Sequence, residues 1–193
     1  TQKRRVLVSQ LINYALEYNL DGINIDFETI GAATGDDFVQ FLRELSIQAH
    51  ANSIVLSGDN YAPTASTAQY DRPEQGIVAD YVVVMGYDEH WGGSEIAGSV
   101  ASIDFVEGGI QKTIEEGVPA NKVINAIPFY TRLWKTENGK VTSEAMGMEA
   151  AMNWVNKNAV ELIWDNQTCQ YYGELQDGNA YYPQMEFVRQ GNL

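Results

Sequence analysis

The feature that most constrains this chain is a short apolar segment with polar residues at every second position, residues 20–28, of sequence LDGINIDFE. A β-strand places successive side chains on opposite faces, so Asn24, Asp26 and Glu28 share one face. The apolar residues between them form the other face, which we expect to pack on a core: Ile23, Ile25 and Phe27. Two carboxylates this close do not ionise independently, and one of them is then suited to act as a general acid near neutral pH. The pattern indicates acid–base chemistry of the kind that cuts a glycosidic bond.

Strands and helices alternate along the first two thirds of the chain. Apolar residues at helical spacing predict helices over residues 4–19, 36–51 and 103–116. Short apolar runs predict strands over residues 22–27, 53–58, 81–85 and 123–127. This order implies right-handed crossovers and a parallel sheet. Because the polar motifs follow the carboxyl ends of strands, the predicted fold is α/β, a TIM (β/α)8 barrel.

The pattern changes after Trp134. Asn138-Gly139 predicts a hairpin within residues 136–141, and a helix is predicted over residues 143–157. Residues 163–182 are rich in aromatic side chains and predict antiparallel strands joined at Asp177-Gly178. We therefore expect a small α+β region here.

The acidic segment resembles the DGxxxDxE signature of glycoside hydrolase family 18, the chitinases and endo-β-N-acetylglucosaminidases. Asp21, Gly22, Asp26 and Glu28 match the signature, and Asn24 replaces its middle acid. An Asn at this place also resembles the bacterial cell-wall and spore-cortex branch of the family.

Three later segments resemble the family in order and spacing. Residues 82–88 resemble the strand that ends in Met-x-Tyr-Asp, and residues 124–134 resemble the G-x-P-F-Y-x-R-x-W strand. Residues 54–59 fill the strand between them and the acidic segment. Four segments in register are a specific signal, whereas one alone is weak.

The resemblance implies a retaining mechanism in which the substrate assists, with neither metal nor cofactor. Glu28 is expected to protonate the leaving oxygen and then to activate water, while the 2-acetamido oxygen of the substrate attacks the anomeric carbon. Asp26 is expected to orient the acetamido N–H, Tyr87 to hydrogen-bond the acetamido group, and Asn24 to hold Asp26.

The same resemblance implies a set of substrate-binding residues: Asp21, Met85, Asp88, Tyr130, Arg132 and Trp134. Trp91 and Trp134 follow strand ends and are as well explained by a sugar groove as by packing in a core. Trp154 and Trp164 fit core packing.

The resemblance assigns the four predicted strands to barrel strands four to seven. Residues 1–134 are then a partial barrel, residues 135–185 the α+β insertion after the seventh strand, and residues 186–193, with Glu186, the start of the return to the barrel. A complete barrel needs roughly 250 residues, so we expect an incomplete one. The open edges near residues 22–27 and 123–127 then predict that the isolated chain is inactive and either self-associates or is unstable.

Charge and composition limit the partners. The 193 residues include 12 basic and 26 acidic side chains, for a net charge of −14 and a pI near 4.4. This balance excludes nucleic acid and an anionic membrane as partners, and no apolar run of about 18 residues predicts membrane insertion. The single Cys169 excludes an intramolecular disulfide, and the start at Thr1 favours a processed or excised piece. With the resemblance, we expect a secreted or cell-wall-associated bacterial protein whose partner is a β-1,4-linked N-acetylglucosamine polysaccharide, chitin or peptidoglycan.

Two alternatives remain open at this point. A chitinase-like lectin would bind glycan without cleaving it, although the Glu28 carboxyl argues for catalysis. A Mg²⁺-dependent barrel enzyme would use oxygen ligands from Asp26, Glu28, Asp59 and Asp88. Asp88-Glu89-His90 is a weaker metal candidate, because consecutive residues of a loop do not converge well on one ion.

Overall fold

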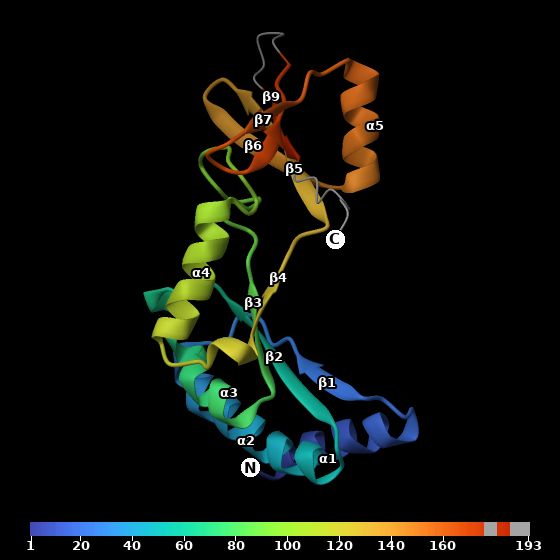
Figure 1. The fold of residues 1–193 in the computed structure, drawn as a ribbon, viewed down its shortest axis with the longest axis vertical. Helices are drawn as coiled ribbons and strands as arrows, with labels where there is room; N and C mark the ends of the chain where they lie inside the picture. Colours follow the sequence, from blue (N-terminus) through green and yellow to red (C-terminus); the bar gives the residue numbers. More distant parts are fainter. Residues whose placement is uncertain (176–180, 186–193) are drawn as a thin grey trace. The chain divides into compact units, whose positions relative to one another are not determined.

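The computed structural model describes residues 1–175 and 181–185, and the chain divides into two compact units (Figure 1). Unit 1 contains Thr1–Met85 and Gly108–Ala126, and unit 2 contains Gly86–Glu107 and Ile127–Leu193. Helix α4 (Ile103–Glu115) contributes residues to both.

Unit 1 is built on a parallel four-stranded sheet. Its strands lie in chain order, β1 (Gly22–Ile25), β2 (Val55–Tyr61), β3 (Tyr81–Met85) and β4 (Val123–Ala126). Every neighbouring pair is parallel. The predicted parallel α/β sheet is confirmed. Closure of these strands into a barrel stays a prediction, and so does self-association through the edges of the sheet.

The helices of unit 1 begin and end close to the predicted positions, with one exception. Helix α1 spans Gln2–Glu17 and α2 spans Gly35–Ala51. Helix α3 (Arg72–Val78) was not predicted, because Pro73 and Gly76 indicate turns in a sequence. Proline is compatible with the first turn of a helix, where its missing N–H has no partner to lose, and the Asp71 carboxylate caps the helix by accepting from the Glu74 N–H. Short 3₁₀ turns η1 (Ala32–Thr34), η2 (Ala65–Tyr70) and η3 (Ala120–Lys122) complete the unit.

Side-chain alternation gives this sheet two unlike faces. One face packs on the helices, and four of its apolar side chains are buried: Ile25, Leu56, Val82 and Val84. Residues from α1 and α2 complete this core, including Ile12, Phe41, Leu42 and Leu45. The opposite face of β1 and β2 carries the polar residues, so the strands separate core from candidate site.

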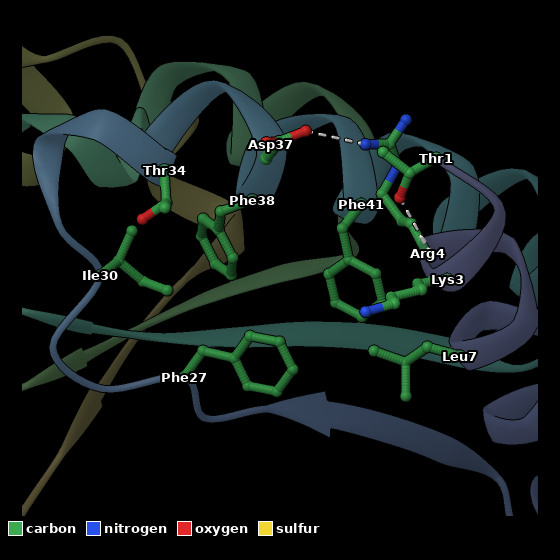
Figure 2. A pocket seen from close by; sticks show the side chains of 10 residues that line it. All are labelled: Thr1, Lys3, Arg4, Leu7, Phe27, Ile30, Thr34, Asp37, Phe38 and Phe41. Carbon is green, nitrogen blue, oxygen red and sulfur yellow. Dashed lines mark hydrogen bonds and ion pairs between the residues drawn. The ribbon is translucent and has the colours of Figure 1, made fainter.

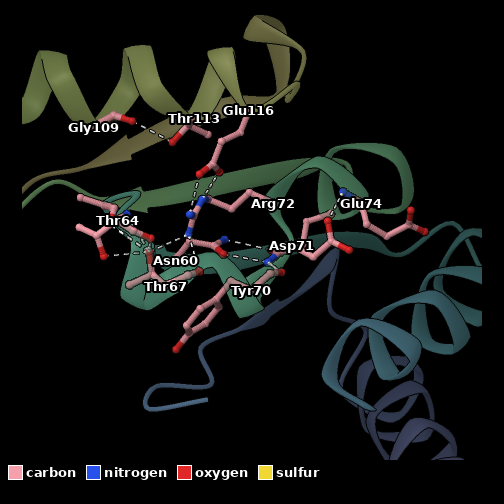
Figure 3. Close-up of polar contacts among 12 residues, drawn as sticks. Asn60, Thr64, Thr67, Tyr70, Asp71, Arg72, Glu74, Gly109, Thr113 and Glu116 are labelled. Carbon is pink, nitrogen blue, oxygen red and sulfur yellow. Dashed lines mark hydrogen bonds and ion pairs between the residues drawn. The ribbon is translucent and has the colours of Figure 1, made fainter. Parts of the chain in front are cut away.

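Two polar pairs tie α3 into unit 1, one buried and one between the buried Arg72 and the exposed Glu116 (Figure 3). The Asn60 and Gln75 amides exchange hydrogen bonds of 3.0 and 2.8 Å, and Gln75 also donates to the Tyr70 carbonyl at 2.8 Å. The Arg72 guanidinium is enclosed and donates twice to the Glu116 carboxylate, at 2.6 and 3.0 Å. Buried polar groups that are fully paired fix one arrangement of their elements.

Unit 2 contains an antiparallel sheet of strand order β6-β5-β9-β8-β7 and helix α5 (Met148–Asn158). Its strands are β5 (Tyr130–Glu137), β6 (Lys140–Gly147), β7 (Ile163–Asp165), β8 (Gln170–Tyr172) and β9 (Tyr181–Met185). The predicted hairpin is confirmed, because Asn138 and Gly139, both at positive φ, connect β5 to β6. The antiparallel strands are confirmed too, whereas the predicted turn at Asp177-Gly178 and the return segment with Glu186 lie outside the described residues.

The predicted helix over residues 143–157 was wrong in its first five positions. Residues 143–147 complete β6, where Ser143 pairs with Trp134 and Gly147 with Tyr130. Pairing along the full length of β5 outweighs any local preference of these five residues for a helix. Within the described ranges, none of the helices has the length and apolar content needed to cross a bilayer.

We predict that Gln75→Leu lowers the free energy of unfolding by about 2 kcal/mol, because the buried Asn60 amide loses both of its hydrogen bonds to Gln75. Urea unfolding of the variant and the parent measures the difference. The control is Gln10→Leu at an exposed position of α1. Equal stability of the two variants would contradict the role of the amide pair.

Candidate active site

The acids of the candidate site follow the carboxyl end of β1 directly. The strand ends at Ile25, so the predicted strand was two residues too long, and Asp26 and Glu28 lie in the segment beyond it. Both side chains are exposed, and so is Asn24, the last residue of β1 on the polar face. In open parallel α/β sheets, ligands bind beyond the carboxyl ends of the strands, and Asp26 and Glu28 lie at such an end.

The backbone after Glu28 is held in a tight turn. Thr29 adopts a positive φ of 57°, a conformation that costs a β-branched residue about 1–3 kcal/mol. The Tyr70 hydroxyl clamps the turn, because it donates to the Phe27 carbonyl at 3.0 Å and accepts from the Ile30 N–H at 3.4 Å. The direction of the acidic segment is therefore fixed from a residue far away in the sequence.

Phe27 anchors the same segment on its apolar side. Its ring stacks on Phe41 with a centroid distance of 5.4 Å and an interplanar angle of 8°, and it borders a pocket of about 360 Å³ (Figure 2). Leu7 and Phe38 line the same pocket. Phe27 is 39% exposed but its ring stacks on α2, so the alternating Asp26 and Glu28 face away from the core.

Strand β2 adds polar side chains to the face that carries Asn24. Ser57, Asp59 and Tyr61 alternate along β2, and Ser57 is the register partner of Asn24. The Ser57 hydroxyl donates to Asn24 Oδ1 at 2.6 Å, and Asn24 Nδ2 donates to Asp59 Oδ2 at 3.0 Å. The Asn24 amide thus pairs across to β2, and its expected role of holding Asp26 stays a prediction.

Tyr61 contacts the expected proton donor. Its hydroxyl donates to Glu28 Oε2 at 2.9 Å, and burial, followed by this bond, raises the pKa of Tyr61 to about 12. The phenol therefore keeps its proton at neutral pH and donates to the Glu28 carboxylate. The sequence analysis missed Tyr61, although polar residues at alternate positions of residues 57–61 were a signal for it.

Asp59 is a half-buried acid with a raised pKa. Burial is the main cause, the hydrogen bond from Asn24 acts in the opposite direction, and the charges of Asp26 and Glu28 raise the pKa further. The sequence analysis considered Asp59 only as a metal ligand. The structure places it instead in a hydrogen-bonded group with Asn24 and Ser57.

Two other predicted residues of unit 1 do not join these acids. Asp21 precedes the amino end of β1, at the opposite end of the strand from Asp26 and Glu28, and its carbonyl accepts from the Val55 N–H. Met85 ends β3 in register with Tyr61 and is nearly enclosed. The geometry gives Asp21 a structural place and leaves Met85 little surface for a ligand.

In unit 2, three predicted residues lie together. The Tyr130 hydroxyl donates a short hydrogen bond to Asp88 Oδ1, and the rings of Tyr87 and Tyr130 meet edge to face at 6.3 Å. Burial and the bond to Asp88 raise the pKa of Tyr130, so its phenol stays protonated. Asp88 itself has a positive φ of 60°, which turns the chain after β3.

The remaining predicted residues of unit 2 differ in exposure. Arg132 Nη1 donates to Ser143 Oγ at 2.9 Å. Trp134 is completely buried and its indole N–H donates to the Gly98 carbonyl at 3.1 Å, which is a packing role rather than the expected contact with a sugar. Trp91, by contrast, is 57% exposed and offers a free aromatic surface.

The side chains of Asp88-Glu89-His90 have separate partners. Glu89 Oε2 accepts from the Ser102 N–H at 2.8 Å, and His90 Nδ1 lies 2.8 Å from the Ser99 carbonyl, while Asp88 accepts from Tyr130. Over residues 1–175 and 181–185, no three His, Cys, Asp or Glu side chains gather as ligands for a metal ion.

The fold and the site define an α/β protein with two exposed acidic side chains just beyond the carboxyl end of a parallel strand. The chain belongs to glycosyl hydrolases family 18, whose family model matches residues 1–189. This confirms the family inferred from the four sequence segments.

Two proteins of Bacillus subtilis (strain 168) are similar in sequence. YvbX, an uncharacterized glycosylase, is 33% identical over 151 residues, which cover 74% of this chain and 42% of that protein. YdhD, a candidate sporulation-specific glycosylase, is 33% identical over 180 residues, which cover 90% of this chain and 40% of that protein. The chain thus spans about two fifths of the length of these curated relatives.

Solved structures show the same fold. The crystal structure of YdhD matches with a TM-score of 0.85 and 28% identity, over 96% of this chain and 63% of that chain. A chitinase from Chromobacterium violaceum ATCC 12472 matches with a TM-score of 0.86 and 25% identity, over 98% of this chain and 61% of that chain.

We predict that the free energy of unfolding of the parent falls as the pH rises and Asp59 ionises. The Asp59→Asn variant should not show this fall. Because the folded-state pKa of Asp59 is raised above its ordinary value of 3.8, the native state binds this proton more tightly than the unfolded state. The contribution of Asp59 is therefore fully present below 3.8 and is lost as the pH rises through the folded pKa.

Urea unfolding at several values between about pH 3 and pH 7 measures this effect as the difference between parent and variant. The matched control is Asp104→Asn, at an exposed position of α4. A parent and an Asp59→Asn variant with parallel pH profiles would contradict the prediction.

Proposed function

We propose that this protein is a glycoside hydrolase that cleaves β-1,4-linked N-acetylglucosamine polymers, chitin or peptidoglycan, by a retaining mechanism in which the substrate assists. The observation that carries the proposal is the combination of the family match over residues 1–189 with an exposed Asp26 and Glu28 just beyond β1. The similar glycosylases and the chitinase support the same class of substrate.

In this mechanism Glu28 protonates the leaving glycosidic oxygen, and the 2-acetamido oxygen of the substrate attacks the anomeric carbon. The resulting oxazolinium ion is opened by a water that Glu28, now a carboxylate, deprotonates. Asp26 orients the acetamido N–H and stabilises the positive charge that develops there. Tyr87 hydrogen-bonds the acetamido group, a role that rests on the family resemblance.

The hydrogen bond from Tyr61 supports the role of Glu28. With Glu28 Oε2 accepting from the phenol at 2.9 Å, the other oxygen of the carboxyl group is free to carry the proton for the leaving group. The exposed position of Glu28 gives a polymer access to that oxygen.

The place of action follows from the substrate. Both polymers lie outside the cytoplasmic membrane, so the proposed site of action is extracellular or in the cell wall. The relatives described as sporulation-specific and cortical fragment-lytic support the cell wall of a bacterium.

We predict that Glu28→Gln, in the full-length protein that contains this sequence, lowers hydrolysis of an aryl N-acetylglucosamine oligomer by about 10²–10⁴-fold. The amide has no acidic proton to transfer, so the chemical step is lost. Its oxygen still accepts from Tyr61, so binding of the oligomer stays close to that of the parent. Release of the aryl group and a binding titration measure the two effects. Glu17→Gln, at the exposed end of α1, is the matched control, and activity of Glu28→Gln within a few-fold of this control would remove Glu28 from the mechanism.

A second prediction concerns the acetamido group. A substrate without the 2-acetamido group should not turn over, because the proposed nucleophile is the acetamido oxygen and not Asp26, and a thiazoline mimic of the oxazolinium ion should inhibit. Steady-state kinetics with matched aryl glycosides measures both. Mass spectrometry that trapped a covalent sugar on Asp26 would overturn this mechanism.

A further inference from the structure

Asn24 stands where the acidic signature has its middle acid, and its amide contacts an acid from the neighbouring strand. Asn24 Nδ2 donates to Asp59 Oδ2 at 3.0 Å. The pair therefore combines one amide and one carboxylate. An Asp at position 24, as in the signature, would place two carboxylates at this contact. A negative charge is present at this place, but it comes from β2.

We propose that Asp59 is a positioning residue of this site, whose carboxylate, held by the Asn24 amide, supplies from β2 the charge that an acid at position 24 would supply from β1. This inference rests on the proposed function, since it names a residue that supports the proposed hydrolysis. Asp59 acts on the reaction through Asp26 and Glu28, and contact with the substrate is not required.

The orientation of the Asn24 amide is set by its second partner. The Ser57 hydroxyl donates to Asn24 Oδ1 at 2.6 Å, so the amide oxygen faces Ser57 and the amide nitrogen faces Asp59. Ser57 and Asp59 lie two residues apart on β2, on the same face. The parallel register of β1 and β2 thus presents one donor and one acceptor to the two ends of a single amide.

The charged groups that act on Asp59 all belong to the same site. The charges of Asp26 and Glu28 act on it from the segment after β1, and β3 brings only Val83 into register beside it. Coulomb coupling is mutual, so the charge of Asp59 also acts on Asp26 and Glu28. A negative charge beside a general acid helps that acid to keep its proton, and it also stabilises a developing positive charge on a sugar ring.

The experiment is a reciprocal exchange in the full-length protein, assayed by hydrolysis of an aryl N-acetylglucosamine oligomer across pH. Asp59→Asn should lower kcat/KM by about 10- to 100-fold, mostly through kcat, as expected for loss of a group that tunes its neighbours. It should also move the alkaline limb of the pH–rate profile to lower pH, because the general acid loses a neighbouring negative charge.

Asn24→Asp should reduce activity as well, because it places two carboxylates at a contact of 3.0 Å. The double exchange Asn24→Asp/Asp59→Asn restores one amide and one carboxylate to the contact, with their strands reversed. It should recover most of the activity that each single variant loses. A residue that only supports the fold would not shift the pH profile and would not be rescued by this exchange.

Two outcomes would overturn the proposal: an Asp59→Asn variant with the kcat/KM and pH profile of the parent, or a double exchange no more active than the weaker single variant. Asp104→Asn, the same chemical change at an exposed position of α4, is the control and should match the parent. Failure of the proposed function is distinct, because the parent itself would then not hydrolyse the oligomer.

Discussion

The parallel pairing of β1 with β2 determines both the core of unit 1 and its polar face. In this register Ile25 lies beside Gly58 on the helix side, and Asn24 lies beside Ser57 on the other side. A slip of one residue would turn the polar side chains of β2 into the apolar layer. Gly58 is part of the same constraint, because a Cβ there would lie 2.9 Å from Gln75 Oε1 and would disturb the amide pair with Asn60. The interactions that place α3 and those that place the candidate site thus depend on one strand pairing.

Periodicity predicted most of this fold, because the strands of unit 1 are short apolar runs and its long helices have one apolar side. The strand over residues 81–85 is an example, since its side chains are aliphatic or aromatic at every position and Val82, Val84 and Met85 are buried. The parts that were missed depend on partners distant in the sequence. Helix α3 is secured by Gln75 and Arg72, which composition alone assigns to a surface, and residues 143–147 become a strand because β5 is there to pair with them. The sequence pattern of a single segment cannot predict contacts with residues that are distant in the chain.

The candidate site was predicted in a similar way, correctly along one strand and incompletely across strands. The acidic signature identified Asp26 and Glu28 because its residues are adjacent in the sequence. From β2, Tyr61 donates to Glu28 and Asp59 accepts from Asn24, and these relations exist only once the register is known. The expected sugar contact of Trp134 came from its place after a strand motif, whereas its burial results from packing and the bond to the Gly98 carbonyl.

The number of charges on the polar face explains why position 24 carries an amide. Asp26, Glu28 and Asp59 already place three carboxyls on neighbouring ends of β1 and β2, and burial makes ionisation of Asp59 less favourable still. A fourth acid at position 24 would add a like charge at hydrogen-bonding distance from Asp59, whereas the amide donates a hydrogen bond to it. Asn24 and Asp59 are therefore best understood as one unit of the site, in which the identity of each residue limits the choice for the other.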